Sequence, residues 1–300
     1  MRKVRWFIEA ASVVVLACPF AVLPRAVALR AGDLLGLLAY YSWGSRRRIA
    51  IDNISKAVRA GGLKIDGSPS SVARKSFINL GRSLVDIIKV YFGLGRGIID
   101  SIEVRGFENY LSAKERGKGI LFITGHCGNW EMTALGFGAR VEPFAVIARA
   151  QNNQYLNRLV EKVRARYGNR IIYKQGALMP IVSELRQNRG IGILMDQAVL
   201  PEEGVVIDFL GSPAWTMKIP ALMARKLGAT VLPSFIHREG SKYIGTFYPP
   251  VVLSQEKDAE KALLEDTKAF SSYIEKHIRE HPAEWLWIHR RWKRAPEKVT

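Results

Sequence analysis

Cysteine and histidine are scarce in this 300-residue chain, which has two cysteines, Cys18 and Cys127, and five histidines. Two cysteines do not form a disulfide framework, so a reducing, cytoplasmic setting is the simpler interpretation. No Cys, His and carboxylate residues occur at the spacing of metal ligands, so we expect no metal site. No fixed-period repeat or low-complexity stretch is present, which argues against a solenoid or a long linker.

Acidic residues are also few relative to basic ones. The chain has 27 Asp and Glu against 45 Lys and Arg, a formal net charge of +18. The positive electrostatic field of such a chain favours binding to phosphates, anionic membranes or an acidic partner protein. Aromatic residues alternate with arginines between residues 285 and 294, but no nucleic-acid-binding fold signature accompanies them. We therefore expect membrane and phosphate contact there, and no nucleic acid partner.

One long apolar run occurs near the start of the chain, from Trp6 to Leu23, with Glu9 and Pro19 inside it. It is barely long enough to span a bilayer. An uncleaved interfacial or shallowly inserted anchor is the favoured interpretation, and a cleaved secretory signal is the alternative. The apolar segment from Ala28 to Tyr41 could lie on the membrane or pack in the core. The basic residues 46–48 could meet lipid phosphates or lie in a solvated loop.

The rest of the chain alternates short apolar strands with helices. This pattern predicts an α/β fold, a mixed sheet flanked by helices, after a long amphipathic helix. Between residues 198 and 216, prolines and glycines predict a long loop. The expected strands are 102–104, 120–123, 144–148, 170–173, 191–195 and 231–235, and the expected helices are 70–92, 108–115, 153–167, 179–187, 216–227 and 256–281.

The segment from Gly119 to Glu131 contains the most informative pattern, because its apolar strand is followed by His126 in a glycine-flanked turn. Asn129 is a good N-cap for the next helix, which places Glu131 in the first helical turn. Glu131 could fold back onto the imidazole of His126, leaving the other ring nitrogen to take a proton. Alternatively, the histidine is unrelated to a glutamate that the helix dipole favours at that position.

Two further polar residues follow predicted strands as His126 does. Arg149 comes after strand 144–148, and Asp196 comes after strand 191–195. In α/β sheets the carboxyl ends of the strands usually open onto the ligand crevice. The sequence therefore predicts that His126, Arg149 and Asp196 share one site.

From about Ala50 to Arg294, the chain resembles the lysophospholipid acyltransferase superfamily and, more closely, the bacterial lipid A biosynthesis acyltransferases. The resemblance depends on an ordered set of motifs that begins with H-x-x-x-x-E at His126 to Glu131. Proline is common in the family where this chain has Ala150 and Met195. The remaining motifs are Arg149-Ala-Gln-Asn-Asn153, Arg164-Ala-Arg166, Met195-Asp-Gln197, Phe209-Leu-Gly211 through Thr216, and Trp287-Ile-His-Arg-Arg-Trp-Lys293.

The resemblance implies transfer of an acyl chain from an acyl carrier protein, or from acyl-CoA, to a hydroxyl of a lipid A precursor. It assigns His126 as general base, Glu131 as the residue that orients it, and Arg149, Arg164 and Asp196 as substrate-binding residues. No cofactor is expected beyond the acyl donor. Residues 1–44 would form a membrane anchor with an amphipathic segment, and residues 45–300 the acyltransferase domain.

The implied location is the inner (cytoplasmic) membrane, with the active site facing the cytoplasm. The loop predicted at residues 198–216 would help to cover the acyl chain, or would pack on the domain without contacting the ligand. Two alternatives are kept. The acceptor could be another glycolipid or a phospholipid, such as a phosphatidylinositol mannoside, or the chain could be a basic peripheral membrane protein without enzymatic activity.

Overall fold

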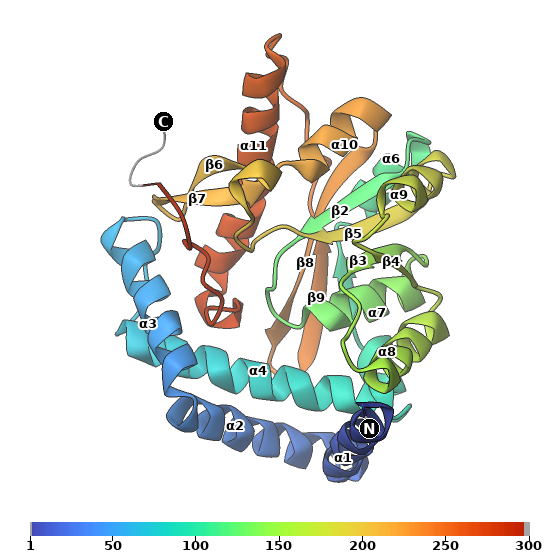
Figure 1. Cartoon of the computed structure of the whole chain (residues 1–300), viewed down its shortest axis with the longest axis vertical. Coiled ribbons are helices and arrows are strands. Elements are labelled where there is room, and N and C mark those ends of the chain that lie inside the picture. Colours follow the sequence, from blue (N-terminus) through green and yellow to red (C-terminus); the bar gives the residue numbers. More distant parts are fainter. Residues whose placement is uncertain (1, 297–300) are drawn as a thin grey trace.

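A seven-stranded mixed sheet forms the centre of the molecule, in the strand order β1-β9-β8-β2-β5-β3-β4 (Figure 1). The computed structural model describes residues 2–296. Residue 1, at the start of the predicted segment 1–44, and residues 297–300, at the end of the predicted segment 45–300, lie outside the described residues. Five strands are parallel, and β9 and β1 run in the opposite direction. The strands are β1 (Glu103–Arg105), β2 (Ile120–Thr124), β3 (Ala145–Ala148), β4 (Arg170–Tyr173), β5 (Gly190–Leu194), β8 (Thr230–Glu239) and β9 (Lys242–Phe247).

Helices cover both faces of this sheet, so the predicted α/β class with a mixed sheet is confirmed. Alternate residues of β2 enter different cores, with Ile120 and Phe122 on one face and Leu121 and Ile123 on the other. Because both faces are buried, β2 is a continuous apolar run. The helices of the first face are α6 (Phe107–Glu115) and α7 (Trp130–Arg140), and those of the second are α9 (Leu178–Arg186), α10 (Ile219–Leu227) and α11 (Ala259–Glu280).

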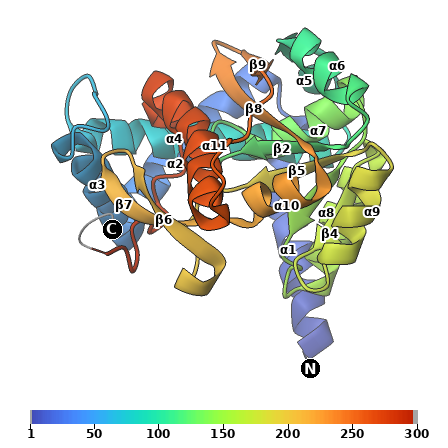
Figure 2. The same ribbon diagram turned by 90° about the horizontal axis from the view of Figure 1, so that it is seen from above.

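The first four helices of the chain lie along one side of the sheet (Figures 1 and 2). Among them α2 packs along α4 at glycines, and a Cβ at Gly36 would lie 2.3 Å from the carbonyl oxygen of Phe77. This backbone approach is possible only without a side chain at that position. The four helices are α1 (Arg2–Val22), α2 (Arg25–Ser42), α3 (Gly44–Arg59) and α4 (Pro69–Tyr91); α5 (Arg96–Asp100) precedes β1, and α8 (Gln154–Arg166) connects β3 to β4.

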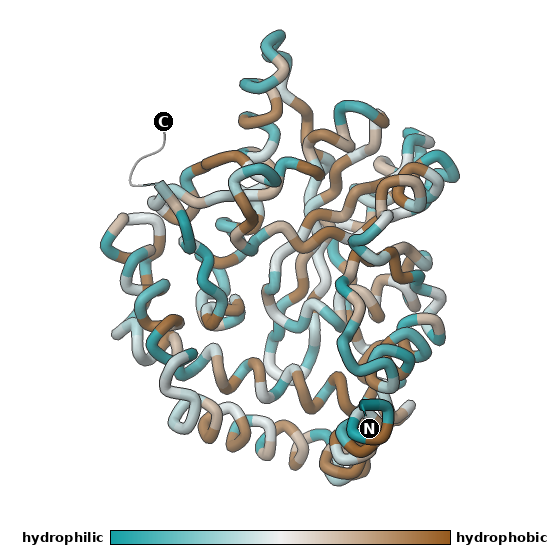
Figure 3. Tube along the Cα trace, viewed as in Figure 1, coloured by the Kyte–Doolittle hydropathy of each residue, from teal (hydrophilic) through white to brown (hydrophobic). Residues whose placement is uncertain are grey.

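Within the described residues, α1 is the one helix whose length and composition would allow it to cross a membrane. Most of its side chains are exposed, and Figure 3 shows hydrophobic residues along both α1 and α2. Where α1 meets α2, the Lys89 ammonium donates to the carbonyl oxygens of Ala21 and Leu23. One side of the segment 28–41 packs on α4, as predicted for a core segment, while Leu34 and Leu38 are 68% and 65% exposed, and its contact with a membrane stays a prediction.

The prediction of a long loop at residues 198–216 is wrong. After a 3-10 turn at Pro201–Glu203, strands β6 (Gly204–Phe209) and β7 (Ser212–Met217) form a hairpin. Its two turn residues, Leu210 and Gly211, have φ values of 52° and 80°, the left-handed conformation that both central residues of a type I′ hairpin turn require. Phe209 and Leu210 are buried in the main core, so the hairpin packs against the domain. The expected helix start at Thr216 is also corrected, because that residue lies in β7.

Candidate active site

His126 and Asp196 form a hydrogen-bonded pair at the carboxyl ends of two adjacent strands. β2 and β5 are parallel neighbours with Thr124 opposite Leu194, so the residues that follow each strand meet. His126 Nδ1 lies 2.8 Å from Asp196 Oδ1, and the backbone amide of His126 donates to Oδ2 over 2.9 Å. The carboxylate is 2% exposed and the imidazole 17%. The buried acceptor therefore fixes both the ring and the turn that carries it.

The same contacts determine the protonation of the pair. Burial raises the pKa of Asp196, but His126 and the indole N–H of Trp285 stabilise the carboxylate more strongly and hold that pKa at about 2. Burial lowers the pKa of His126, yet the Asp196 carboxylate and its hydrogen bond raise it above 6.5 overall. With Asp196 ionised, a neutral His126 carries its proton on Nδ1 and presents Nε2 as an acceptor.

Two further side chains contact the imidazole ring of His126. The amide of Gln197 is 3.2 Å from His126 Nε2, and the Trp130 ring packs edge-on at 5.2 Å between centroids. Within residues 2–296, the hydrogen bonds of the His126 ring involve Asp196 and Gln197. The same amide nitrogen lies 3.4 Å from Nδ1, nearly as close, so it contacts the face of the ring rather than the lone pair of Nε2 in the ring plane.

The predicted contact between Glu131 and the imidazole is corrected by the structure, which places Asp196 there instead. Glu131 forms a bidentate ion pair with Arg164 of α8, at 2.8 and 2.7 Å, and accepts a hydrogen bond from Tyr91 of α4. It is the second residue of α7, whose first turn directs it toward α4 and α8 rather than back toward the turn. Burial lowers the pKa of Arg164, but Glu131 raises it overall, so the guanidinium stays charged.

The turn after His126 is held in place by close backbone packing at Gly128 and by the hydrogen bonds of Asn129. Gly128 has φ of +55°, and a Cβ there would lie 2.1 Å from the carbonyl oxygen of Ile236. Asn129 is the predicted N-cap of α7, and its side-chain oxygen accepts from the amide of Met132 over 3.3 Å. Its amide group donates to the Ser83 carbonyl and the Tyr243 hydroxyl, which ties the turn to α4 and β9.

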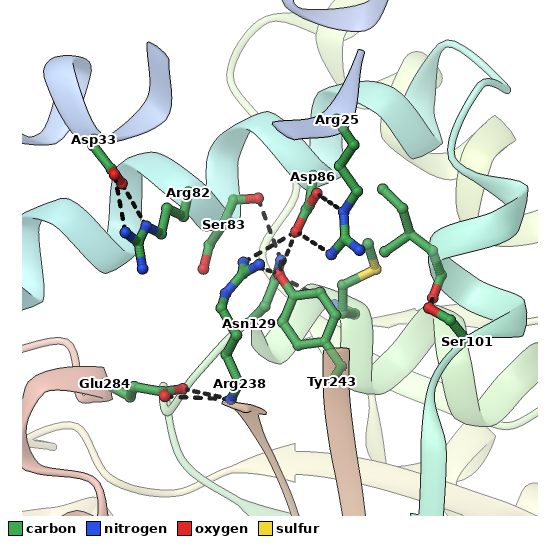
Figure 4. Close-up of polar contacts among 12 residues, drawn as sticks. Arg25, Asp33, Arg82, Ser83, Asp86, Ser101, Asn129, Arg238, Tyr243 and Glu284 are labelled. Atoms are coloured by element: carbon green, nitrogen blue, oxygen red, sulfur yellow. Dashed lines mark hydrogen bonds and ion pairs between the residues drawn. The ribbon is translucent and has the colours of Figure 1, made fainter. Parts of the chain in front are cut away.

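Tyr243 belongs to a buried polar group that we call the Asp86 cluster, formed by Arg25, Asp86, Arg238 and Tyr243 (Figure 4). Asp86 is 0% exposed and accepts from Arg25 at 3.0 and 3.1 Å, from Arg238 at 3.0 Å and from Tyr243 at 2.9 Å. These residues come from α2, α4, β8 and β9. Through Asn129, the cluster links the N-terminal helices to the turn that carries His126.

The carboxyl-terminal residues 285–289, which we call the strap, form another wall of the site. The indole N–H of Trp285 donates to Asp196 over 2.7 Å, and the amide of Leu286 donates to the carbonyl oxygen of His126 over 3.0 Å. Trp285 and Trp287 are 2% and 0% exposed. The prediction that these aromatic residues contact a membrane is therefore wrong, because they are part of the core and support the His126–Asp196 pair.

Arg291 is likewise buried rather than available for phosphate. It is 0% exposed, donates to the backbone oxygen of Trp215 over 2.6 Å, and lies 4.3 Å from the ring centroid of Phe209. Burial lowers its pKa to about 10, so it stays protonated at neutral pH. Arg291 thus joins the carboxyl-terminal segment to the β6–β7 hairpin.

Cys127 has no features of a nucleophile, although it follows His126. Its side chain is 2% exposed, and its backbone forms a bridge with Trp285. Burial, together with the charges of Asp196 and Glu284, raises the pKa of the thiol well above its usual range. A thiol that stays protonated attacks thioesters poorly.

Arg149 follows β3, which lies beside β5, and its side chain is exposed. No hydrogen bond or ion pair within residues 2–296 joins it to the His126–Asp196 pair. The structure therefore brings His126 and Asp196 together, places Glu131 and Arg164 in a separate ion pair, and leaves Arg149 exposed after β3. The same described residues contain no group of three or more His, Cys, Asp or Glu side chains placed to hold a metal ion.

Comparison with known proteins identifies the family. The sequence model of the bacterial lipid A biosynthesis acyltransferases matches residues 1–294. The chain belongs to this family. The resemblance found from the ordered motifs is thus confirmed.

Individual relatives in the family are distant. The chain is 26% identical over 280 residues to a lipid A biosynthesis lauroyltransferase of Escherichia coli, covering 92% of this chain and 89% of that protein. It is 26% identical over 192 residues to a phosphatidylinositol mannoside acyltransferase of Mycobacterium tuberculosis, covering 63% and 59%. Against a lipid A biosynthesis acyltransferase of Haemophilus influenzae it is 25% identical over 213 residues, covering 67% and 64%. The last two matches thus span less than two thirds of those proteins.

Proposed function

We propose that the protein transfers a fatty acyl chain from a thioester to a hydroxyl of a membrane glycolipid, with His126 as general base. The observation that carries this proposal is the His126–Asp196 pair, in which a buried carboxylate holds Nδ1 and directs Nε2 outward. Membership of the acyltransferase family supports the reaction class. In this mechanism Asp196, rather than Glu131, orients the imidazole.

Acyl transfer requires activation of the acceptor, because a neutral hydroxyl is a weak nucleophile. As its oxygen attacks the thioester carbonyl, His126 Nε2 takes the hydroxyl proton and Asp196 stabilises the imidazolium. The tetrahedral intermediate then collapses and breaks the C–S bond. The imidazolium returns the proton to the departing sulfur, so that ester and thiol are released and His126 is neutral again.

The oxyanion of that intermediate needs hydrogen-bond donors. In the turn after β2, the amide of His126 already donates to Asp196, and the amide of Gly128 donates to the carbonyl oxygen of Glu284. These two amides are therefore occupied. The side-chain amide of Gln197, 3.2 Å from Nε2, is a nearby donor that we assign to the oxyanion.

Glu131 and Arg164 are assigned a positioning role in this proposal. Their ion pair is largely buried, at 11% and 16% side-chain exposure, and it joins α7 to α8 beside the His126 turn. Arg149, exposed beyond β3, is assigned to binding a phosphate of donor or acceptor, because an unpaired guanidinium suits phosphate geometry.

We expect Asp196→Asn to lower kcat/KM about 100-fold and to move the acidic limb of its pH profile to lower pH. The carboxylate raises the pKa of His126, whereas burial lowers it, so removing the charge lets burial dominate. The neutral imidazole is the base, so activity is lost as pH falls through that pKa. A pH profile of kcat/KM measures the shift.

Glu131→Gln is the matched control, because it removes a carboxylate that does not touch the ring. Glu131→Gln should leave the acidic limb of the kcat/KM pH profile at the same pH as in the unmodified protein, even if it changes the maximum rate. An unchanged limb in Asp196→Asn, or a shifted limb in Glu131→Gln, would contradict the assignment of Asp196 as the residue that orients His126.

The proposed donor is an acyl carrier protein, an acidic partner that a +18 chain would attract, with acyl-CoA as the alternative. The proposed acceptor is a lipid A precursor, and the relative that acylates phosphatidylinositol mannosides provides the second candidate. We place the protein at the inner membrane with its active site facing the cytoplasm, where thioester donors are made. No cofactor beyond the donor is proposed.

The proposed reaction is tested with purified protein in a nonionic detergent and donors that carry a labelled acyl chain. Acyl carrier protein and CoA donors are each paired with a lipid A precursor and with a phosphatidylinositol mannoside. We expect label to move from the carrier protein to the lipid A precursor fastest. If no pair yields labelled lipid while the protein still binds anionic vesicles in a salt-sensitive manner, the protein is a non-enzymatic membrane protein.

A further inference from the structure

A pocket of about 420 Å³ lies between α3 and the carboxyl-terminal segment, away from the His126–Asp196 pair. Figure 1 shows the two elements side by side, although they are more than 200 residues apart in sequence. The charged residues that line it are Arg48, Asp52, Arg290 and Lys293. Three cations against one carboxylate make the lining net positive, so an anion would be favoured there.

The cations of this pocket differ from nearby Arg46, whose side chain is held by other groups of the protein. Arg46 donates to the Ile288 carbonyl and lies 5.5 Å over the Trp43 ring, so it is used in holding the structure. In contrast, Arg48, Arg290 and Lys293 are exposed, and within residues 2–296 no ion pair includes them. Two guanidinium groups and one ammonium group provide the donors that a phosphate accepts from.

The walls of the pocket are fixed by contacts beneath it. Asn53 of α3 donates to the carbonyl oxygens of Trp287 and His289, at 2.8 and 2.6 Å. On the carboxyl-terminal side, Trp292 donates to the carbonyl oxygen of Ser212, and the Lys56 ammonium lies 5.7 Å from its ring centroid. Since the backbone of both walls is anchored, ligand binding would have to order only the basic side chains, which favours affinity.

The surface next to the pocket suits a membrane. At the end of α2, immediately before α3, the side chains of Leu38, Tyr41 and Trp43 are 65%, 62% and 50% exposed. Exposed aromatic residues beside cations are typical of the headgroup level of a bilayer, with the phosphates at the cations. Figure 3 shows that the hydrophobic residues of α2 continue toward α1, the candidate membrane span.

We propose that this pocket binds the phosphate of a membrane lipid headgroup. The strap connects it to the catalytic pair, because the amide of Leu286 donates to His126 while Arg290, four residues later, lines the pocket. Four residues span at most about 14 Å. A lipid phosphate in the pocket would thus hold the His126 site close to the headgroups. Binding of the lipid does not depend on the acyl-transfer function proposed above.

The test uses the full chain in a nonionic detergent, because the detergent covers α1 equally in every variant. The protein is titrated with dihexanoyl phosphatidic acid, and binding is measured by calorimetry. The double variant Arg290→Gln/Lys293→Gln should bind about thirtyfold more weakly, since each basic residue near a lipid surface contributes about 1 kcal/mol. Lys257→Gln/Lys261→Gln, which removes two exposed lysines around the start of α11, is the matched control and should bind as the unmodified protein does. Equal weakening in both double variants would overturn the proposal.

The ligand source is decided by three further titrations of the same protein. Dihexanoylglycerol, which lacks the phosphate, should bind weakly, and inorganic phosphate should compete poorly because it lacks the lipid. If CoA bound to the pocket more tightly than phosphatidic acid and was lost in the double variant, the pocket would belong to the acyl donor. If inorganic phosphate competed as well as the lipid, the site would be a general anion site. Either result would refute lipid headgroup binding.

Discussion

Replacing His126 with alanine should lower kcat about 10³-fold or more and leave the fold intact. The imidazole is the one group in the Asp196 hydrogen-bond network that would take the acceptor proton, and general-base catalysis contributes about 10²- to 10⁴-fold. Its ring is partly exposed, and its contacts beyond Asp196 are with Gln197 and Trp130, so little packing is lost. Single-turnover transfer of labelled acyl groups measures the effect.

His281→Ala is a suitable control, since the His281 ring stacks on His237 at 4.1 Å and lies outside the hydrogen bonds of the catalytic pair. It should transfer acyl groups at nearly the unmodified rate. The double variant His126→Ala/Asp196→Asn should be no slower than His126→Ala alone, because Asp196 acts through the imidazole. Near-normal turnover by His126→Ala would refute the base assignment.

Cys127 allows a covalent acyl-enzyme to be excluded by the same assay. The thiol is buried and its pKa is raised, so Cys127→Ser should retain most of the activity. A loss as large as that of His126→Ala would instead indicate that the acyl group passes through the cysteine.

The fold could be predicted largely from apolar runs and caps. β2 was visible because both its faces are buried, and Asn129 marked the start of α7. The β6–β7 hairpin was missed because its turn is Leu210-Gly211 rather than a typical Asn-Gly or Asp-Gly pair. β9 was missed as well, since it contains Gly245, which faces the ring of Phe137 and has no apolar side chain to continue the pattern.

The sequence predicted that His126 and Asp196 would lie together, but it assigned Glu131 as the partner of the imidazole. His126 and Asp196 follow separate strands, so their meeting depends on the order of strands in the sheet, which local sequence does not encode. Glu131 was the plausible partner because it is five residues away, whereas Asp196 is 70 residues away. The available signal was an aspartate directly after an apolar strand, as in Met195-Asp196.

The carboxyl-terminal signature was misinterpreted for a related reason. Tryptophans alternating with arginines occur both at membrane interfaces and in cores where each polar atom has a partner. Here the indole of Trp285 donates to Asp196, and that of Trp287 donates to the Pro282 carbonyl at 2.6 Å. Only the tertiary structure provides those acceptors.

Asp86→Ala should destabilise the protein by about 3–5 kcal/mol, because it leaves Arg25 and Arg238 without their shared carboxylate in a buried site. Arg238 is 8% exposed and Asp86 0%. Since Tyr243 and Asn129 extend the cluster to the His126 turn, acyl transfer should also fall at temperatures where the protein is still folded. Urea unfolding in a nonionic detergent, followed by tryptophan fluorescence, measures the loss of stability.

Asp33→Ala is the control that separates the effect of burial from the effect of losing a paired carboxylate on the stability of the protein. Asp33 also pairs with an arginine of α4, Arg82, but the two side chains are 29% and 37% exposed. Such a partly exposed pair is expected to contribute at most about 1 kcal/mol. If both variants lost equal stability, the Asp86 cluster would be an ordinary surface-type ion pair. A large loss in Asp86→Ala alone would indicate that the N-terminal helices and the catalytic turn are stabilised together by one buried carboxylate.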